Sequence, residues 1–474
     1  RARRQGGAGG ATIGRAAATQ LEQVVVTATG ESQRLREQGS APARVELAPE
    51  RLPAVPSFSQ ALSGQAAGVQ VLQSSGTAGT GSRIRIRGTN SLTLSNEPLI
   101  VIDGVRVQGT TSGTGTTGAF SIGIGGQSPS RLDDINPEEI ESIEVLKGPA
   151  ASGLYGTQAA NGVIQITTKK GRAGRTQWTT YAERGLTQEV SPFPANYGGW
   201  FTNEGEREIG CDLTSVAAGF CTQDSLAVFN PLKDPRTTPF RDGARTQLGL
   251  NVAGGNERIG YFLSGESDRE AGIYETNALN RTNLRANLRA FLTEDLDVNV
   301  STGYVRSQLQ LPGNDNTFLG YISNGLAGFP RIDDPGAING DGYDPLGPAS
   351  LAFYQNFQRT NRAIGSLQTN WRPAGWLRVT GIAGFDQSTR FDTQYLPPER
   401  VDLDQETREG YRTANRFLFS TYTAQATATA DFALTEALRS TTTLSFQYQQ
   451  EGIDGVRGTG FRIVAGTGSL EGTV

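Results

Sequence analysis

Residues 135–174 read INPEEIESIEVLKGPAASGLYGTQAANGVIQITTKKGRAG, and this stretch decides the fold. Its Pro-Glu-Glu start predicts a helix-like segment that runs into a strand over Ile143–Leu146. Gly148-Pro149 predicts a turn, small residues follow, and Gly162–Thr168 is typical of a second strand. The stretch therefore predicts a compact unit that mixes short helical segments with strands.

A helix and another strand are predicted upstream of this stretch. Phe58, Leu62 and Ala66 recur at helical spacing, and Gly68 is expected to end the helix. Residues 69–73 (VQVLQ) then predict a strand, and a turn of Gly, Thr and Ser follows it. The unit thus begins near residue 55.

Two strand patterns lie between these segments. Residues 82–88 (SRIRIRG) alternate basic and apolar side chains, which places isoleucines on one face and arginines on the other. These residues are Ile84 and Ile86, and Arg83, Arg85 and Arg87. Leu99–Val107 predicts a hairpin with Asp103-Gly104 as its two-residue turn.

The sequence changes in character after Lys169, where long alternating strands begin. Strands of globular proteins are usually about 5–6 residues long, whereas tilted membrane strands need about 9–11. The expected strands are longer than the globular average, so they favour a membrane barrel. They are Thr176–Thr187, Arg245–Gly254, Arg258–Gly272, Arg281–Thr293, Leu296–Leu311, Ala363–Arg372, Leu377–Tyr395, Arg416–Leu434 and Ser440–Gly455.

The connections between these strands alternate in length. Short turns are expected near residues 255–257, 294–295, 373–375 and 435–439, and long connections over 188–244, 312–362 and 396–415. The connection over 273–280 is of moderate length. Short turns on one side and long loops on the other are typical of outer-membrane barrels.

Composition excludes several other classes of protein. A formal net charge of −4 over 474 residues lacks the basic excess of a nucleic-acid-binding protein. The chain has no His, which excludes His-based catalytic triads and His-ligated zinc. No run approaches the roughly 20 apolar residues of a membrane helix. A membrane location would therefore require a closed barrel of strands.

The two cysteines and the N-terminal residues give further expectations. Cys211 and Cys221 lie in one polar segment and are expected to form a disulfide in an oxidising compartment, with two free thiols or a metal site as the alternatives. The chain has no Met and starts at Arg1, from which we expect a processed or truncated N-terminus. Residues 1–20 are rich in Gly, Ala and Arg and are expected to be a linker or the frayed tail of another domain. Residues 31–54 are polar and charged and are expected to be a flexible spacer.

Two loop motifs are given no role in chemistry. Residues 113–118 (GTGTTG) match the spacing of a dinucleotide-binding motif, but no helix follows them and no βαβ unit surrounds them. The acidic loop Asp333–Asp344 offers oxygen ligands for calcium, but its spacing is not that of an EF-hand. Both are expected to be solvated loops.

Three blocks together resemble the SusC/RagA branch of TonB-dependent outer-membrane receptors. Gln60–Val71 resembles the first plug motif, Arg83–Gly88 with Asn96–Val107 (NEPLIVIDGVRV) the second, and Ile135–Gly174 the third. The resemblance implies a mainly β protein, in which an N-terminal α+β plug domain sits inside a transmembrane antiparallel β-barrel of about 22 strands. It implies a linker over 1–54, a plug over 55–174 and about the first nine barrel strands over 175–474, so the chain is expected to be a fragment.

The resemblance also implies partners. The energy transducer TonB, with ExbB and ExbD, would pull on a Ton box ahead of the plug, and position and composition favour Val24, Val25, Val26, Thr27 and Ala28 for it. TonB would bind this extended segment by strand addition, and an ordinary β-strand is the alternative for these residues. A SusD-like surface lipoprotein, oligosaccharide or peptide cargo and outer-membrane lipid complete the expected partners. No cofactor, catalytic residue or nucleic acid is expected.

The charged residues of the plug suggest how it is held. Buried charges need partners, and the plug sits in a polar barrel. We expect a charged lock between plug and wall that draws on Arg83, Arg85, Arg87, Glu141 and Glu144, with Arg87 and one glutamate at its centre. The alternative for these residues is solvated charge in the lumen.

Three other functions remain open from the sequence. A siderophore or cobalamin receptor without a lipoprotein lid is favoured by Gly148-Pro149 and opposed by the NEPLIVIDGV and AANGVIQITTKKG blocks. A β-rich surface adhesin would need no Ton box. An enzyme is the least favoured class.

Overall fold

The computed structural model describes two bodies of structure joined through residues 169–173. It describes residues 24–26, 32–34, 43–46, 57–73, 75–92, 95–109, 131–148, 155–313, 315, 317–332, 341–401, 403, 405–435, 438–464 and 470. Of the segments singled out in the sequence, 1–20, Thr27 and Ala28, 113–118 and 333–340 lie outside the described residues. The first body is the plug domain and the second is a long curved sheet, the barrel sheet.

The barrel sheet contains nine antiparallel strands in sequential order. The expected set of nine strands is confirmed, although β18 and β20 begin earlier than the sequence predicts. The strands are β10 (Gly174–Thr187), β14 (Gly243–Gly255), β15 (Ile259–Ala271), β16 (Ala278–Phe291), β17 (Leu296–Gln310), β18 (Gln355–Ala374), β19 (Leu377–Leu396), β20 (Tyr411–Ala433) and β21 (Arg439–Phe461). In the described part of the chain, β10 and β21 form the two edges of this sheet.

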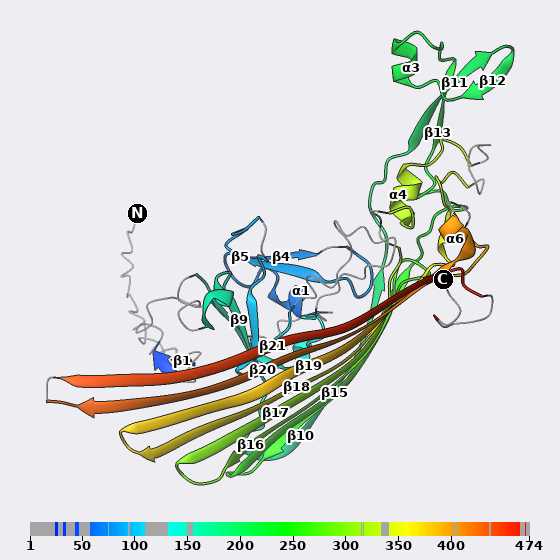
Figure 1. Ribbon diagram of the computed structural model, residues 1–474. Coiled ribbons are helices and arrows are strands. Elements are labelled where there is room, and N and C mark those ends of the chain that lie inside the picture. Colours follow the sequence, from blue (N-terminus) through cyan, green and yellow to red (C-terminus); the bar gives the residue numbers. More distant parts are fainter. Residues whose placement is uncertain are drawn as a thin grey trace, which may run out of the picture.

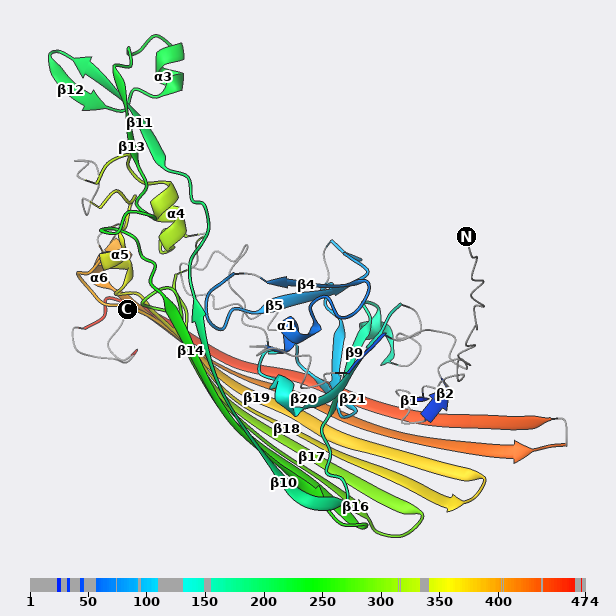
Figure 2. The ribbon, with the colours of Figure 1, turned by 180° about the vertical axis from the view of Figure 1, so that it is seen from behind.

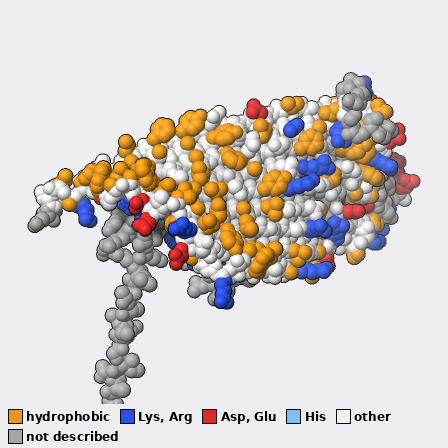
Figure 3. Space-filling model, turned by 90° about the horizontal axis from the view of Figure 1, so that it is seen from below, with side chains coloured by type: hydrophobic (Ala, Val, Ile, Leu, Met, Phe, Trp, Pro, Cys, Tyr) orange, Lys and Arg blue, Asp and Glu red, His pale blue; other side chains and the backbone are white. Residues whose placement is uncertain are grey.

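The barrel sheet turns its apolar side chains outward and its polar side chains inward. Along β16, the outward Leu284 and Leu288 are about half exposed, whereas the inward Arg281 and Arg285 are buried. A water-soluble sheet would show the opposite alternation, so this pattern is that of a membrane barrel with a polar lumen. Figure 3 shows hydrophobic side chains across the convex face, with charged ones gathered toward the end that carries the long connections.

This outward apolar band predicts the effect of a charge placed in it. Replacing Leu284 with Arg near the middle of β16 is expected to destabilise the inserted protein by about 2–4 kcal/mol, because the guanidinium would have to enter lipid. Asn280 faces outward near the end of the same strand, so Asn280→Arg should cost only about 0–1 kcal/mol. Urea titration of folding into lipid vesicles measures both values. Equal losses would contradict the position of the apolar band.

The connections differ in length at the two ends of the barrel sheet, as predicted. Short turns join β14 to β15, β16 to β17, β18 to β19 and β20 to β21. The long connections gather at the opposite end (Figures 1 and 2). They contain β11 (Asn196–Asn203), β12 (Glu206–Ile209), α3 (Leu213–Ala217), β13 (Ser225–Phe229), α4 (Tyr321–Leu326), α5 (Pro348–Leu351) and α6 (Gln405–Glu409).

One apolar cluster ties these long connections together. Tyr274 and Tyr321 stack with ring centroids 4.9 Å apart, and Phe240 lies against Tyr274. The cluster continues through Leu351, in the same connection as Tyr321, and through Val401, in the connection between β19 and β20. The four connections therefore form one packed unit above the barrel sheet.

The plug domain is a small α+β unit that lies against the concave face of the barrel sheet (Figures 1 and 2). Its main sheet has the order β3-β8-β9-β6-β7, in which only β6 and β9 are parallel, and β4 pairs with β5 in a second sheet. The elements are β3 (Ala43–Glu46), α1 (Phe58–Leu62), β4 (Val69–Gln73), β5 (Ser82–Ile86), β6 (Leu99–Ile102), β7 (Val105–Val107), β8 (Ile140–Leu146) and β9 (Val163–Thr168).

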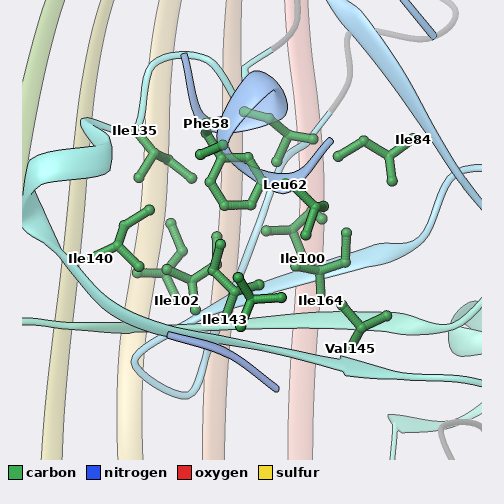
Figure 4. Packing of buried hydrophobic residues seen from close by; sticks show 14 of the residues in the cluster. Phe58, Leu62, Ile84, Ile100, Ile102, Ile135, Ile140, Ile143, Val145 and Ile164 are labelled. Atoms are coloured by element: carbon green, nitrogen blue, oxygen red, sulfur yellow. The ribbon is translucent and has the colours of Figure 1, made fainter. Parts of the chain in front are cut away.

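The core of the plug domain lies between α1 and the main sheet. Phe58 and Leu62 of α1 are fully buried and meet Ile100 of β6 and Ile143 of β8 (Figure 4). Ile84 of β5 belongs to the same cluster. The isoleucine face of β5, which the alternating sequence pattern predicts, is therefore buried in the core. Because these side chains come from segments far apart in sequence, the core holds the plug together as one domain.

The structure differs from the sequence analysis at three places in the plug domain. The helix-like segment after residue 135 is only a single 3-10 turn, Pro137–Glu139, because the strand β8 already begins at Ile140. The helix expected to reach Gly68 ends at Leu62. The spacer expected over 31–54 contains β3, which pairs with β8, and also β2 (Ser32–Arg34).

The predicted hairpin and disulfide are both present. Asp103 and Gly104 have φ angles of 46° and 82°, the left-handed values that a tight two-residue turn requires. Cys211 and Cys221 are joined in a disulfide that closes the loop around α3. Within the described residues, no helix has the length and apolar character needed to cross a membrane.

Candidate functional site

The candidate site is the polar interface between the plug domain and the inner wall of the barrel sheet. The plug contributes the loop 131–139, the hairpin β6–β7 and the end of β9, and the wall contributes inward side chains of β15 to β20. Most of these side chains are charged or hydrogen-bonding, yet they are buried. Burying such groups is costly unless each finds a partner, so the partners define the interface.

Glu139 of the plug forms an ion pair with Arg285 of β16. The Nε atom of Arg285 lies 2.6 Å from Oε2 of Glu139, and both side chains are almost fully buried. Ser264 of β15 donates a hydrogen bond to the other carboxylate oxygen, Oε1, at 2.9 Å. Glu139 is placed here by the 3-10 turn Pro137–Glu139, which Asn136 caps by accepting a hydrogen bond from Glu138 N.

Arg362 of β18 contacts both the plug and the neighbouring strand β19. Its guanidinium binds Asp386 of β19 with two contacts of 2.8 Å. The same group donates to two plug carbonyls, those of Arg131 at 2.8 Å and Gln108 at 2.9 Å. In return, Gln108 N donates to Asp386 Oδ2. Arg362 is only 1% exposed, so this pair joins the plug to two strands in the absence of bulk water.

Loop 131–134 adds contacts in both directions. Arg131 donates to Thr360 at 2.9 Å and to Gln358 at 2.6 Å, both on β18. Asp134 lies 3.3 Å from Arg131 and 3.7 Å from Arg362, so it links the two arginines. Arg131 of the plug thus donates to acceptors on the wall, and Arg362 of the wall donates to acceptors on the plug. These opposed contacts fix the position of the plug along the wall.

Arg281 of β16 continues the interface toward β14 and β15. It donates to the carbonyl of Asp133 and forms an ion pair with Asp268 at 2.8 Å, and Asp268 also binds Arg245. The carboxyl of Asp133 accepts hydrogen bonds from Ser59 at the start of α1. Burial raises the pKa of Asp133, and the hydrogen bonds from Ser59 oppose that shift.

The turn of the β6–β7 hairpin docks on the wall through Asp103. Its carboxylate accepts from Ser301 of β17 at 2.8 Å and from the hydroxyl of Thr168 at 2.6 Å. Gln368 of β18 donates to the Asp103 carbonyl at 2.6 Å. The hairpin turn therefore bonds to two wall strands at once.

A glycine in the wall allows this close approach. A Cβ at Gly384 of β19 would overlap Val105 of the hairpin and the backbone of β18. Gly384→Val is therefore expected to weaken plug docking by about 1–3 kcal/mol, the usual cost of overpacking. The rate at which a protease cleaves the plug in the purified protein measures how far docking is weakened.

The matched control for that substitution is Gly265→Val. A Cβ at Gly265 would meet only Leu284, at 3.5 Å, which is ordinary van der Waals contact. Equal protease sensitivity of the two variants would show that Gly384 has no special role in docking.

A cleft lies between the plug and the wall on the β20–β21 side. It has a volume of about 680 Å³ and is lined by the plug side chains Asn90, Asn161 and Gln158 and by wall residues that include Thr421 and Glu451. Arg106 lies 3.8 Å from Glu451 across it. Amide, hydroxyl and charged groups facing one space suit a hydrogen-bonding ligand.

Among the described residues, no group of three or more His, Cys, Asp or Glu side chains is placed to hold a metal ion. The arrangement can instead hold the plug in one position and release it when its ion pairs separate.

Comparison with known proteins places the chain in a family. Residues 49–163 match the TonB-dependent Receptor Plug Domain family. TonB-dependent receptor P26 of Formosa agariphila is 30% identical over 71% of this chain and 33% of its own length. TonB-dependent receptor SusC of Bacteroides thetaiotaomicron is 30% identical over 52% of this chain and 22% of its own length.

A solved structure agrees with these relatives in fold. The RagAB peptide importer in its open-open state matches 95% of this chain and 52% of its own chain, with a TM-score of 0.70 and 22% identity. The chain belongs to the SusC/RagA-type TonB-dependent receptors. It spans about a third or less of the length of the two curated relatives. Both curated relatives are named as receptors, not as enzymes.

The receptor's plug–wall ion pairs lie on other residues than those predicted for the charged lock. Glu144 pairs with Arg44 of β3 at 3.2 Å, inside the plug, and burial raises its pKa although Arg44 opposes the shift. Glu141 pairs with Arg172 in the segment that leads to β10. The expectation of a lock built on these two glutamates is therefore corrected to Glu139, Asp134 and Arg131.

The three predicted arginines lie away from the described wall contacts. Arg83 and Arg85 lie near Glu97 at the surface of the plug, where they oppose the rise in the pKa of Glu97 that burial causes. Arg85 donates to Thr89, and Arg87, with a φ of 61°, packs over Gly148. The printed contacts of these three arginines are therefore with the plug itself and not with the barrel sheet.

The predicted Ton box is only partly described in the receptor. Val24–Val26 form β1, which pairs antiparallel with β2. Thr27 and Ala28 lie outside the described residues. The assignment of residues 24–28 as the TonB-binding segment stays a prediction.

Sequence reasoning overlooked the wall residues of the lock, although a signal for them was present. Residues 281–290 read RTNLRANLRA, so Arg281, Asn283, Arg285 and Asn287 occupy alternate positions on one face of β16. An alternating row of Arg and Asn inside a membrane strand indicates a buried polar surface opposite.

Proposed function

We propose that this receptor imports a nutrient across the outer membrane through a barrel that its plug closes and that TonB opens. The observation that supports this most is the plug on the concave face of the barrel sheet, held by the buried ion pair Arg285–Glu139 and by Arg362, which donates to plug carbonyls while it pairs with Asp386 in the wall. A protein that only adhered to a surface would not need this polar interface.

The chemistry of the interface suits repeated closing and opening. A buried ion pair contributes little net stability over hydrated ions, because desolvation offsets the attraction. It nevertheless fixes register, since a displaced plug would leave charges unpaired. When the plug moves, water in the lumen can hydrate both partners again. The interface can therefore be specific without being permanent.

TonB would act through the N-terminal segment. The run Val24–Val26 is extended in β1, and a β-branched extended run suits strand addition to a partner sheet. We propose residues 24–28 as the segment that TonB, energised by ExbB and ExbD, pulls. The adjoining β3 ends the main sheet of the plug, so a pull on the N-terminal side is transmitted directly to β8.

The cargo is proposed to be an oligosaccharide or a peptide, delivered with a SusD-like surface lipoprotein. The relatives named SusC and the RagAB peptide importer support this class. The polar cleft of about 680 Å³ offers amide and hydroxyl groups that both kinds of oligomer can bind. The outward apolar band supports a location in the outer membrane.

One sequence feature favours a siderophore-type receptor as a second candidate. Gly148-Pro149 follows β8, and Gly148 has a φ of 78° with Arg87 packed above it. The experiment that separates the two is affinity purification of the full-length receptor from native outer membranes, with mass spectrometry of stoichiometric partners. A SusD-like lipoprotein in the complex supports oligomer import. The receptor alone, rising under iron starvation, overturns it in favour of a siderophore.

A further inference from the structure

The outward face of the barrel sheet carries a row of arginines near the end with the long connections. This arginine belt consists of Arg184, Arg269, Arg306, Arg359, Arg412 and Arg416. The orientation is clear at Arg359, which lies between Gln358 and Thr360, two inward residues that bind the plug. Figure 3 shows basic side chains gathered at this end of the convex face.

Four of the belt arginines share one cross-strand row, and a fifth lies beside it. The paired residues of the row are, in order, Arg184, Thr246, Arg269, Asn280, Gln308, Arg359, Phe391 and Arg416. Arg306 is the diagonal neighbour of Arg359, and such neighbours lie about 7–8 Å apart. Arg359 and Arg416 are two strands apart, which corresponds to about 10 Å. Three long side chains from neighbouring strands can therefore reach one anionic group.

The arginine belt lies at the border of the outward apolar band. Arg269 is ten residues beyond Ile259, where β15 begins, and Arg306 is ten residues beyond Leu296, where β17 begins. Both strands begin at short turns. Ten residues extend about 33 Å along a strand, or about 25 Å in height at a tilt of about 40°. Because the apolar band of such barrels is about 25 Å tall, these arginines lie where hydrocarbon ends and headgroups begin.

The charges at this end of the barrel sheet are sorted between its two faces. The outward face of the described strands carries one acidic side chain there, Asp454 on the edge strand β21. Four carboxylates are instead buried on the inner face, and these are Glu266, Asp268, Asp386 and Asp392. Arg362 of the inner face pairs with one of them. Within the described part of the chain, none of the belt arginines forms an ion pair, so an anionic partner would have to come from outside the barrel sheet.

The position and sign of the arginine belt limit what that partner can be. Contact with water alone would allow acidic side chains among the arginines, because both signs can extend to water at the interface. A second copy of the chain would bring the same positive belt and be repelled. Phosphate groups of lipids lie at this depth and are negative. Their oxygens also match the fork of donors that a guanidinium presents.

We infer that the arginine belt is a binding site for phosphate-bearing lipids of the outer leaflet, with Arg306, Arg359 and Arg416 at its centre. The inference rests on the proposed function, because it takes the long connections to face the outside of the cell. It adds a ligand class and a site on the outer surface of the receptor, away from the plug. Bound headgroups would hold the barrel at a fixed depth in the membrane.

Lipid binding to the full-length receptor tests the inference. The purified receptor in neutral detergent is titrated with a lipid that carries one phosphate monoester on a sugar headgroup, or with the same lipid after phosphatase treatment, and native mass spectrometry counts bound lipid. Three arginines near one phosphate should make the phosphorylated lipid bind at least about tenfold more tightly. Arg306→Gln with Arg359→Gln and Arg416→Gln should abolish most of this preference. All three side chains are exposed, so the variant should fold normally.

The matched control removes three exposed arginines at the end with the short turns. Arg258→Gln with Arg372→Gln and Arg439→Gln makes the same change in net charge and should keep the preference. Equal loss in both triple variants would show that overall charge, and not the arginine belt, attracts the lipid. Equal binding of the two lipids by the unaltered receptor, or an undiminished preference in the belt variant, would overturn the inference. Excess inorganic phosphate should not displace the lipid, whose acyl chains also bind; full displacement would make the belt a site for free anions.

Labelling of intact cells separates the inference from the proposed function. Val190 lies in the connection between β10 and β14 and is 84% exposed. Val190→Cys in the full-length receptor should react with a membrane-impermeant maleimide. If it does not react, the long connections do not face the outside, and the proposed function fails together with the inference. If it reacts but the lipid preference is absent, the inference fails alone.

Discussion

Arg362→Ala is expected to weaken the docking of the plug by about 3–5 kcal/mol, the usual loss when one member of a buried ion pair is removed. The variant leaves the carboxylate of Asp386 buried without its cation, and it removes the donors to the carbonyls of Arg131 and Gln108. The measurement is hydrogen exchange of the plug core in the detergent-solubilised receptor, where amides of β6 and β9 should lose protection.

The chain offers a close control for this substitution. Arg378 of β19 also binds an aspartate on the next strand, Asp431, at 3.2 Å, but 44% of the Arg378 side chain is exposed. Exposed pairs contribute only about 0–1 kcal/mol, so Arg378→Ala should leave plug exchange unchanged. Similar loss of protection in both variants would show that the Arg362 cluster stabilises the barrel sheet in general and not the plug.

A double variant separates the effect of leaving Asp386 unpaired from the effect of losing the hydrogen bonds that Arg362 donates to the plug. Arg362→Leu with Asp386→Leu removes both charges, and such replacements are often close to neutral. We expect it to recover part of the protection lost in Arg362→Ala. The donors to the two plug carbonyls remain absent, so recovery should be incomplete.

Val25→Pro is expected to weaken binding of the TonB periplasmic domain at least about tenfold. Strand addition uses the backbone N–H groups of the added strand, and proline has none. The loss of one good ladder hydrogen bond, about 1.4 kcal/mol, already corresponds to a factor of ten. The affinity of the purified domain for the purified receptor measures it.

The control for this substitution is Val25→Thr. Threonine keeps the N–H group and the β-branched shape, so the affinity should stay within about twofold. If both variants bind as the wild type does, residues 24–28 are not the TonB-binding segment. If both lose affinity equally, the side chain of Val25 and not the strand backbone is recognised.

The barrel strands could be predicted because their signals are local. Length and alternation identify each strand without knowledge of its neighbours, and sequential antiparallel pairing then follows from the turns. The same holds for the hairpin at Asp103-Gly104 and for the disulfide, whose cysteines lie only ten residues apart. The start of β18 was missed because Gln355–Arg362 are mostly polar.

The partners in the lock could not be predicted, because they depend on how two bodies meet. Glu139 and Arg285 are 146 residues apart, and Arg131 and Thr360 are 229 apart. A shift of one residue in register would turn Arg285 to the lipid face. Glu139 and Glu141 differ only in position around the 3-10 turn and β8, and the sequence does not show which one faces the wall. The expectation that buried charges between plug and wall are paired is confirmed, but the residues predicted to form those pairs are wrong.

Cysteine accessibility in living cells tests the central claim most directly. Ser264 is buried at the wall and donates to Glu139, so Ser264→Cys in the full-length receptor should become reactive only when the plug leaves the wall. With a membrane-impermeant maleimide, the account predicts labelling in energised cells, little labelling after the proton gradient is collapsed, and little labelling when Val25→Pro is also present. Equal labelling in all three conditions would contradict a plug that TonB moves, and would favour a static surface protein.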